Sequence, residues 1–481
     1  MKIDYLQEPE LEFGGHGRDV DIRRGLTLYG PLDHVEGKSR AVRVGVIGLA
    51  RSNDGIISWL ERCKAGIKAK TSRQPNLFPD FPGFSFESPF RAELEIQPSA
   101  ISTISAQEMS QVVSQPTQER VIADALSLFE QRVRDVSEKE RPHVVIVAVP
   151  EELVSLDEPD ESEANPEFKR EEPEYQTKID FRHALKAAMM KFNQPIQLVL
   201  EHTYNSMAKP AGSASELGRP LQDEATRAWN FHTALYYKAN NRPWRVFRNP
   251  NDLQTLFVGI SFYKTLDQNS LRTSVAQVYD ELGEGVIVRG KVVEVTKKDR
   301  QPHLSTEDAT ELLTSALTAY RSEHRHLPAR AVLHKSSSYT NVETIGFQAA
   351  AQQAKLDMLD MLVVSKSLTR LFRDGAYPPL RGTMVSLDQD THLLYTRGSV
   401  PYFSTYPGMY VPRPLKFQLV QAEESPKRLA QELLALTKLN WNNTQFDGGE
   451  PITMRVADQV GKILKYVPEG ALVQPRYSFY M

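Results

Sequence analysis

The run Pro142-His143-Val144-Val145-Ile146-Val147-Ala148-Val149-Pro150 bears most directly on the fold of this chain. From Val144 to Val149 every residue is apolar, and a proline lies on each side of the run. An unbroken apolar run of this length is typical of a parallel strand buried on both faces of a sheet. The run therefore predicts an α/β architecture.

Helical and extended patterns alternate on both sides of this run. Residues 118–139, ahead of it, carry apolar residues at helical spacing. Strands alternating with helices indicate βαβ units. The other elements expected here are strands at 41–50 and 196–200 and helices at 56–65, 181–192 and 228–238.

A second region begins after Trp244, and its first strands follow one another directly. Strands at 255–263, 274–279 and 286–289 predict an antiparallel meander, with a turn at 281–285. Ser305 and Asp308 predict the start of a helix that runs to about residue 324. This order resembles an RNase H-like domain. The remaining expected elements are strands at 331–334, 361–365, 383–387 and 392–396 and helices at 426–439 and 452–466.

The net charge of −3 over 481 residues conceals an uneven distribution. Residues 151–175 hold 11 acidic residues against Lys169 and Arg170, a local charge of −9 that leaves +6 on the remaining chain. This acidic stretch predicts a solvated loop. Cys63 is the only cysteine, which excludes an internal disulfide and a cysteine-rich zinc site. The sequence shows no secretion signal and no apolar run long enough to cross a bilayer, so a cytoplasmic protein is expected.

One group of polar residues could hold a terminal phosphate. Arg182 and Lys186 lie four residues apart on an expected helix, and therefore on one face of it. Gln197 comes at the end of the following turn, and Lys238 on the later helix. Arginine offers a fork of donors, lysine a point charge and glutamine a neutral donor. The alternative is that Arg182 and Lys186 are simply a solvated helix face.

The second region lacks the carboxylates that an RNase H-like nuclease requires. Such an enzyme holds two divalent ions with acidic residues on its first strand and on neighbouring strands. The first strand here, 257–263, has no acidic residue, and neither has the strand at 332–337, where Lys335 would place a cation instead.

A basic and aromatic stretch is a further candidate for nucleic-acid binding. Residues 321–416 hold 12 Lys and Arg against 7 Asp and Glu. Cations can follow phosphates, and aromatic rings can stack on bases. A generic charged surface over core aromatics is the alternative. The residues concerned are Lys366, Arg370, Arg373, Arg381, Arg397, Arg413, Lys416, Tyr377, Tyr395, Tyr402, Phe403, Tyr406 and Tyr410.

Several short motifs, in this order along nearly the whole chain, resemble those of short prokaryotic Argonautes. They are Leu11-Glu12-Phe13-Gly14, Asp21-Ile22-Arg23-Arg24-Gly25-Leu26, Tyr29-Gly30-Pro31-Leu32, Leu185-Lys186, Gln194-Pro195-Ile196-Gln197, the segment from Ala234 to Trp244, the segment from Leu436 to Asn442, and the segment from Asp447 to Ile452.

The resemblance implies a Rossmann-like MID domain over residues 1–250, with the acidic loop at 151–178, followed by an RNase H-like PIWI domain over residues 251–481. It places the guide 5′-phosphate on Arg182, Lys186, Gln197 and Lys238. It assigns the carboxylate of Met481 to a magnesium ion at that phosphate. Ser261 and Ser336 stand where slicing members have aspartates, so the resemblance implies a catalytically inactive protein.

The function that the resemblance implies is guided sensing. A 5′-phosphorylated guide RNA would pair with single-stranded DNA of an invading plasmid or phage. The signal would pass to a partner in a heterodimer, an APAZ-domain protein with a TIR or sirtuin-like effector that degrades NAD in abortive-infection immunity. Two alternatives remain open from the residues: an active RNase H-like nuclease with unrecognised carboxylates, and an unguided single-strand binder.

Overall fold

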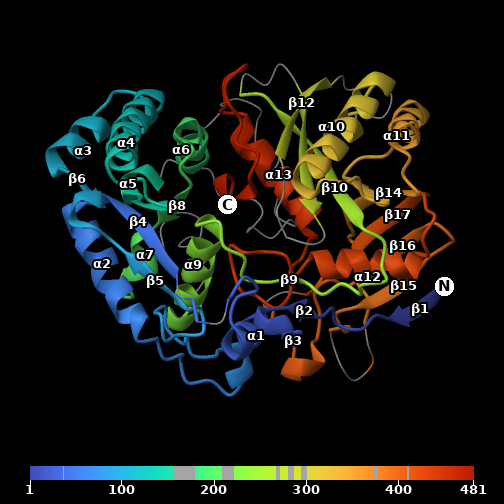
Figure 1. Ribbon diagram of the computed structural model, residues 1–481, viewed down its shortest axis with the longest axis horizontal. Coiled ribbons are helices and arrows are strands. Elements are labelled where there is room, and N and C mark those ends of the chain that lie inside the picture. Colours follow the sequence, from blue (N-terminus) through green and yellow to red (C-terminus); the bar gives the residue numbers. More distant parts are fainter. Residues whose placement is uncertain are drawn as a thin grey trace.

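The computed structural model of the protein contains two α/β halves, each built around its own large sheet (Figure 1). The structure describes residues 1–481 except 36, 39, 155–178, 209–220, 267–270, 280–286, 294–300, 373, 375–377 and 409–410. Most of the acidic loop expected at 151–178 therefore lies outside the described residues, as does the turn expected at 281–285. Among the described residues, no helix is both long and apolar enough to cross a membrane.

The sheet of the first half consists of parallel strands around the strand expected from the opening run. Val144 and Ile146 pack with Trp59 on one face, whereas Val145 and Val147 pack with Phe129 on the other. The strand is thus buried on both sides, which explains its unbroken apolar sequence. The strand order is β5 (Ala92–Glu95), β4 (Arg40–Leu49), β7 (Val144–Ala148) and β8 (Ile196–Val199). Strand β6 (Ile101–Ile104) pairs with the last residues of β4, whereas β5 pairs with its first residues.

Helices cover both faces of this sheet, and two of them begin at aspartate caps. Asp180 accepts a hydrogen bond from the backbone N–H of His183, and Asp223 accepts one from that of Thr226. Such caps satisfy backbone donors that the first helical turn leaves free. The helices are α2 (Ala50–Lys64), α3 (Ala106–Val113), α4 (Gln118–Glu140), α5 (Glu151–Val154), α6 (Phe181–Met189), α7 (Glu201–Tyr204) and α9 (Glu224–Lys238). Helix α1 (Ile22–Tyr29) lies apart from this sheet, beside the short strands near the N-terminus (Figure 1).

The second half is built on a nine-stranded mixed sheet. Strands β10, β11 and β12, which follow one another along the chain, form the expected antiparallel meander, and β10 also pairs in parallel with β13. In sheet order the strands are β1 (Lys2–Tyr5), β15 (Thr383–Ser386), β16 (Thr391–Leu394), β17 (Leu415–Gln421), β14 (Met358–Lys366), β13 (Arg330–Lys335), β10 (Thr255–Lys264), β11 (Leu271–Tyr279) and β12 (Ile287–Val293).

Helices also cover both faces of the nine-stranded sheet. Val258 on β10 packs in one apolar cluster with Leu313 of α10 and Phe347 of α11, whereas Phe257 packs in another with Val460 of α13. The bounds are α10 (Thr306–His324), α11 (Asn341–Ala354), α12 (Pro426–Leu436) and α13 (Ile452–Leu464).

Segments from the two ends of the sequence cross between the halves. Strand β1 is hydrogen-bonded to β15, with Ile3 opposite Val385, so it belongs to the nine-stranded sheet although the prediction grouped it with residues 1–250. In the opposite direction, the short helix Tyr477–Phe479 packs beside α9 of the first half (Figure 1). A small third sheet, β3 (Arg18–Asp19), β2 (Leu11–Glu12) and β9 (Arg245–Val246), completes the fold.

Candidate functional site

A buried lysine lies where the two halves meet. Lys238 is the last residue of α9 and is only 2% exposed. Its ammonium donates hydrogen bonds to the main-chain oxygen of Ile196 (2.8 Å), to Oε1 of Gln197 (2.8 Å) and to the main-chain oxygen of Met481 (3.1 Å). One cation thus joins α9, strand β8 and the segment that follows α13.

The electrostatic surroundings of Lys238 disfavour its charge. Burial lowers the pKa of Lys238 well below its ordinary value, and the positive charge of Lys186 lowers that pKa further. An anion bound here would stabilise the charged form of Lys238, because it offsets both the desolvation of the ammonium and the repulsion by Lys186.

The first turn of α6 carries further charge toward the same region. The Asp180 carboxylate accepts from Nδ1 of His183 at 3.0 Å and lies 3.7 Å from the Arg182 guanidinium. Burial acts to raise the pKa of Asp180, but the hydrogen bond and charge of His183, followed by the charge of Arg182, hold that pKa well below its ordinary range. The carboxylate therefore fixes the orientation of two basic side chains.

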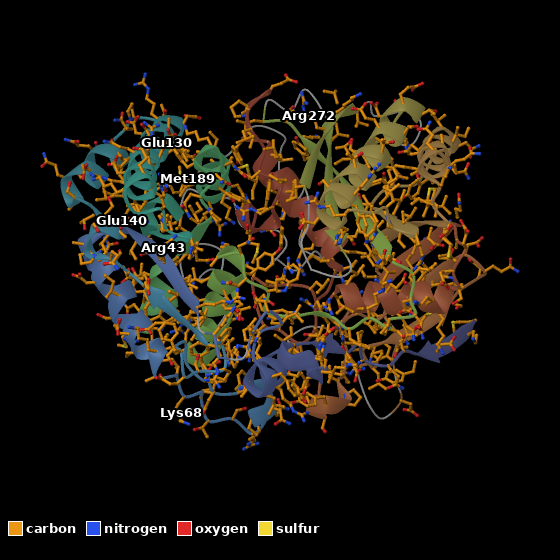
Figure 2. All side chains as sticks on the ribbon, in the orientation of Figure 1. Arg43, Lys68, Glu130, Glu140, Met189 and Arg272 are labelled. Atoms are coloured by element: carbon orange, nitrogen blue, oxygen red, sulfur yellow. The ribbon has the colours of Figure 1, made fainter. Side chains whose placement is uncertain are left out.

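Helix α6 is held in place from two sides. Lys191, just beyond the helix, forms an ion pair with Glu130 of α4 at 2.6 Å; Glu130 and Met189, the last residue of α6, are both labelled in Figure 2. From the second half, the Tyr466 hydroxyl accepts from the backbone N–H of Asp180 at 2.9 Å. The helix is thereby anchored to the first half by α4 and to the second half by the chain after α13.

The structure brings Lys186, Gln197, Lys238 and Met481 of the predicted phosphate site together, and Arg182 lies on the same helix as Lys186. Gln197 and Met481 both accept from Lys238, and Lys186 is near enough to lower the pKa of Lys238. Arg182 and Lys186 are half-buried on α6, so they are not a fully solvated helix face. Arg182 is turned toward Asp180. Whether these residues bind phosphate stays a prediction.

Gln197 has its expected position, and its side chain makes contacts that the sequence did not predict. The residue follows the turn at Gln194–Pro195 and is the second residue of strand β8, within the strand expected at 196–200. Its amide Nε2 donates to the main-chain oxygen of Leu198 at 3.1 Å, and its Oε1 accepts from Lys238 at 2.8 Å. In this conformation Gln197 orients Lys238 through its amide oxygen and uses one of its two amide N–H donors on the main chain.

Four residues of this neighbourhood were missed by the sequence analysis. Asp180 precedes the helix in the position of a cap, a signal that was readable. Tyr466 and Gln474 lie far away in the sequence, and nothing local marks them. The amide of Gln474 donates to the main-chain oxygen of Met190 at 2.8 Å, which ties the segment before Met481 to the first half. His183 was the fourth.

In the second half, one of the two serines at expected aspartate positions lies on β10, and the other follows the adjacent parallel strand β13. Ser261 is buried within β10, and the backbone N–H of Ser336, just after β13, donates to the oxygen of Ile260 at 3.4 Å. Lys335 is fully buried and forms an ion pair with Glu343, which is also fully buried. Within the described part of the chain, no cluster of three or more His, Cys, Asp or Glu residues could hold a metal ion.

Part of the basic and aromatic stretch belongs to the core and not to a surface. Arg381 is 1% exposed and forms an ion pair with Glu8 at 3.0 Å, and Tyr395 is fully buried. Lys366, by contrast, is exposed, and it pairs with Glu450 at 2.9 Å. These residues hold segments together, so the stretch as a whole was interpreted too broadly. Arg373, Tyr377 and Tyr410 lie outside the described residues.

No protein-family model matches the sequence, and no curated protein matches it significantly. Solved structures do match. The chain superimposes on Clostridium butyricum Argonaute bound to a guide DNA and a 19-mer target DNA with a TM-score of 0.65 and 15% identity, covering 98% of this chain and 54% of that one. It superimposes on Drosophila Piwi with a TM-score of 0.60 and 13% identity, covering 99% and 56% of the two chains. The fold is Argonaute-like.

A third match, to A. aeolicus Argonaute, has a TM-score of 0.55 at 14% identity and covers 98% of this chain and 54% of that one. The chain therefore spans about half the length of the Argonaute and Piwi structures that it matches. These superpositions confirm the predicted fold class, a Rossmann-like MID domain followed by an RNase H-like PIWI domain. At these identities the likeness concerns the fold alone.

Proposed function

We propose that this chain binds the 5′-phosphate of a guide strand at Lys238 and pairs the guide with a target nucleic acid. The observation that carries the proposal is the buried ammonium of Lys238, held by Gln197 and Met481 and repelled by Lys186. A phosphate dianion supplies the negative charge that this arrangement favours. The Argonaute-like fold adds support, since one matching structure is described as bound to a guide DNA and a target DNA.

The chemistry of the Lys238 neighbourhood also fits a magnesium ion, which is part of the proposal. Magnesium prefers oxygen ligands, keeps several waters, and is commonly held by one or two carboxylates together with substrate phosphates. The carboxylate of Met481 would provide the ligand from this chain, since the main-chain oxygen of Met481 lies at the site. A bound ion would neutralise part of the phosphate charge.

A guide with a 5′-phosphate is expected to bind at least about tenfold more tightly than the same guide with a 5′-hydroxyl, because each charge-assisted contact contributes roughly 1.5–3 kcal/mol. Lys186→Ala should weaken the phosphorylated guide by about tenfold and leave the hydroxyl guide nearly unchanged. Fluorescence anisotropy with RNA and DNA guides measures both. Lys191→Ala, just beyond the end of the same helix and paired with Glu130 of α4, is the matched control. Equal affinity for the two guides would reject the site.

We further propose that the protein binds its target without cutting it. The positions of Ser261 and Ser336, with the Lys335–Glu343 ion pair next to them, support this view. Two-metal phosphoryl chemistry needs converging carboxylates that bind divalent ions. Purified protein loaded with guide should leave a labelled complementary RNA or DNA intact in magnesium or manganese. Guide-dependent cleavage that survives removal of contaminating nucleases would favour the alternative of an active nuclease.

The wider role is proposed from the sequence resemblance. In that view the chain forms a heterodimer with an APAZ-domain protein carrying a TIR or sirtuin-like effector. Pairing of a guide RNA with single-stranded DNA of a plasmid or phage then activates NAD degradation.

A further inference from the structure

Strand β1 forms one end of the nine-stranded sheet, and among the described residues only one of its two edges is occupied. Its inner edge is hydrogen-bonded to β15, and no described strand pairs with its outer edge. Figure 1 shows β1 at the periphery of the molecule, beside the marked N-terminus. An edge of this kind presents a row of main-chain donors and acceptors to a strand of another chain.

The hydrogen bonds between β1 and β15 show which main-chain groups of β1 face outward. The backbone N–H of Leu6, directly after β1, donates to the main-chain oxygen of Gly382 at 2.9 Å. Main-chain groups point alternately to the two edges of a strand, so the residues two and four positions before Leu6 also face β15. The N–H and C=O groups of Ile3 and Tyr5 therefore face the outer edge.

The side chains of β1 do little to protect this edge against pairing. Natural edge strands are commonly blunted by proline, by a bulge or by unbalanced charge. Ile3 and Tyr5 favour extended structure and are 62% and 40% exposed, and β1 pairs with β15 without a shift of register. The charged residues of the strand are Lys2 and Asp4, which form an ion pair at 3.0 Å on one face. The charge of the strand is therefore balanced.

We propose that a second copy of this chain adds its own β1 to this edge, antiparallel, with a two-fold axis at Ile3. In this register Ile3 lies opposite Ile3 of the copy, and Lys2 lies opposite Asp4 of the copy on both sides of the axis. The outward N–H and C=O groups of the two Ile3 residues form a hydrogen-bonded pair. The oppositely charged pairs fall at non-hydrogen-bonded positions, where side chains approach most closely.

The charges of β1 select both this register and this occupant. Shifting one strand by two residues preserves the hydrogen-bonding pattern, but it sets Lys2 opposite Lys2 in one direction and Asp4 opposite Asp4 in the other. Like charges directly opposite one another destabilise a sheet. A strand with a lysine and an aspartate two residues apart is thus complementary to itself. Because β1 spans only four residues, the contact area is small and the dimer dissociates on dilution.

Sedimentation velocity of the guide-free full chain at increasing protein concentration measures this association. We expect a monomer–dimer equilibrium with a dissociation constant on the order of 10–100 μM, because the contact area lies below the roughly 1,200 Å² of standard complexes. Ile3→Pro removes the outward N–H and keeps the hydrogen bonds to β15, since proline is tolerated at an edge position whose N–H faces solvent. It should weaken the dimer by at least about tenfold.

An exchange of charges tests the register independently of Ile3. Lys2→Glu alone and Asp4→Lys alone each set like charges opposite one another at both pairs, so each variant should dimerise at least about tenfold more weakly than the original chain. A mixture of the two variants restores opposite charges at both pairs and should form a heterodimer about as tight as the original dimer. Lys139→Glu, at an exposed position of α4, makes the same charge change as Lys2→Glu and should leave the association unchanged.

Three results would each overturn the proposal. They are a chain that stays monomeric at several times the expected dissociation constant, a dimer that persists unchanged in Ile3→Pro, and a mixture of the two charge variants that associates no more than either variant alone. The first result would leave the outer edge of β1 to a strand of a different protein. None of these measurements involves a guide, so they are independent of the proposed guide site.

Discussion

Replacing Glu343 with alanine is expected to lower the free energy of unfolding by about 3–5 kcal/mol, because it leaves a buried ammonium without its counter-ion. Glu343 and Lys335 both have fully buried side chains. The same carboxylate accepts from the backbone N–H of Leu304 at 2.9 Å and from that of Thr340 at 2.8 Å, which caps α11. Urea or thermal unfolding of the variant measures the loss.

A control and a compensating variant separate the ion pair from the cap. Glu307→Ala removes an exposed acidic residue from the first turn of α10, and it should cost less than about 1 kcal/mol. Lys335→Met combined with Glu343→Gln removes both charges and keeps the side-chain volumes similar, so it should recover about 2 kcal/mol of the loss. A loss below about 1 kcal/mol for Glu343→Ala would show that the pair contributes little.

Lys238→Met is expected to weaken binding of a 5′-phosphorylated guide by about 100-fold, since removing one partner of a buried charge pair costs about 2–5 kcal/mol. The methionine occupies similar space but leaves the acceptors of Ile196, Gln197 and Met481 without this donor. The affinity for a 5′-hydroxyl guide should fall far less. Anisotropy titrations of both guides test this, with Lys462→Met, a partly exposed lysine on α13, as the control. A similar loss for both guides would indicate a structural role for Lys238.

The pH dependence of guide affinity gives a second reading of Lys238. In the guide-free protein burial lowers the pKa of Lys238 below its ordinary 10.5. A phosphate dianion favours the charged lysine and raises that pKa, so binding takes up a proton once the free protein has begun to lose it. Affinity should therefore fall as the pH rises from the lowered pKa toward 10.5. It should also fall below about pH 6, where the phosphate gains a proton. Lys238→Met should abolish the alkaline decline.

The fold was predictable to the extent that local patterns determine it. The apolar run at 142–150 and the capped helix at 305–324 became β7 and α10, because each carries its own periodicity and boundary signals. Strand β1 was not found, since Lys2–Tyr5 alternates weakly and is stabilised by pairing with β15, nearly four hundred residues away in sequence. Helix α11 was also missed, although Thr340 and Glu343 form a capping box at its start.

In the candidate site, too, local contacts were predictable from the sequence and long-range contacts were not. Arg182 and Lys186 could be placed together because helical spacing is local. The contact between Lys238 and Met481 could not be derived from spacing, since it depends on how the chain returns from the second half. Arg381 and Tyr395 were among the candidates for a binding surface, because composition does not distinguish a buried ion pair from an exposed cation.

The crossing of segments between the halves affects how the molecule can be taken apart. Strand β1, from the start of the chain, is the edge strand of the nine-stranded sheet in the second half. In the other direction, the segment from Gln474 to Met481 is hydrogen-bonded to Met190, at the end of α6, and to Lys238 of α9 in the first half. The two halves are therefore joined by exchanged segments as well as by packing. If the chain were cut near residue 250, each fragment would contain a segment that packs in the other half. We therefore infer that the two halves unfold as one cooperative unit.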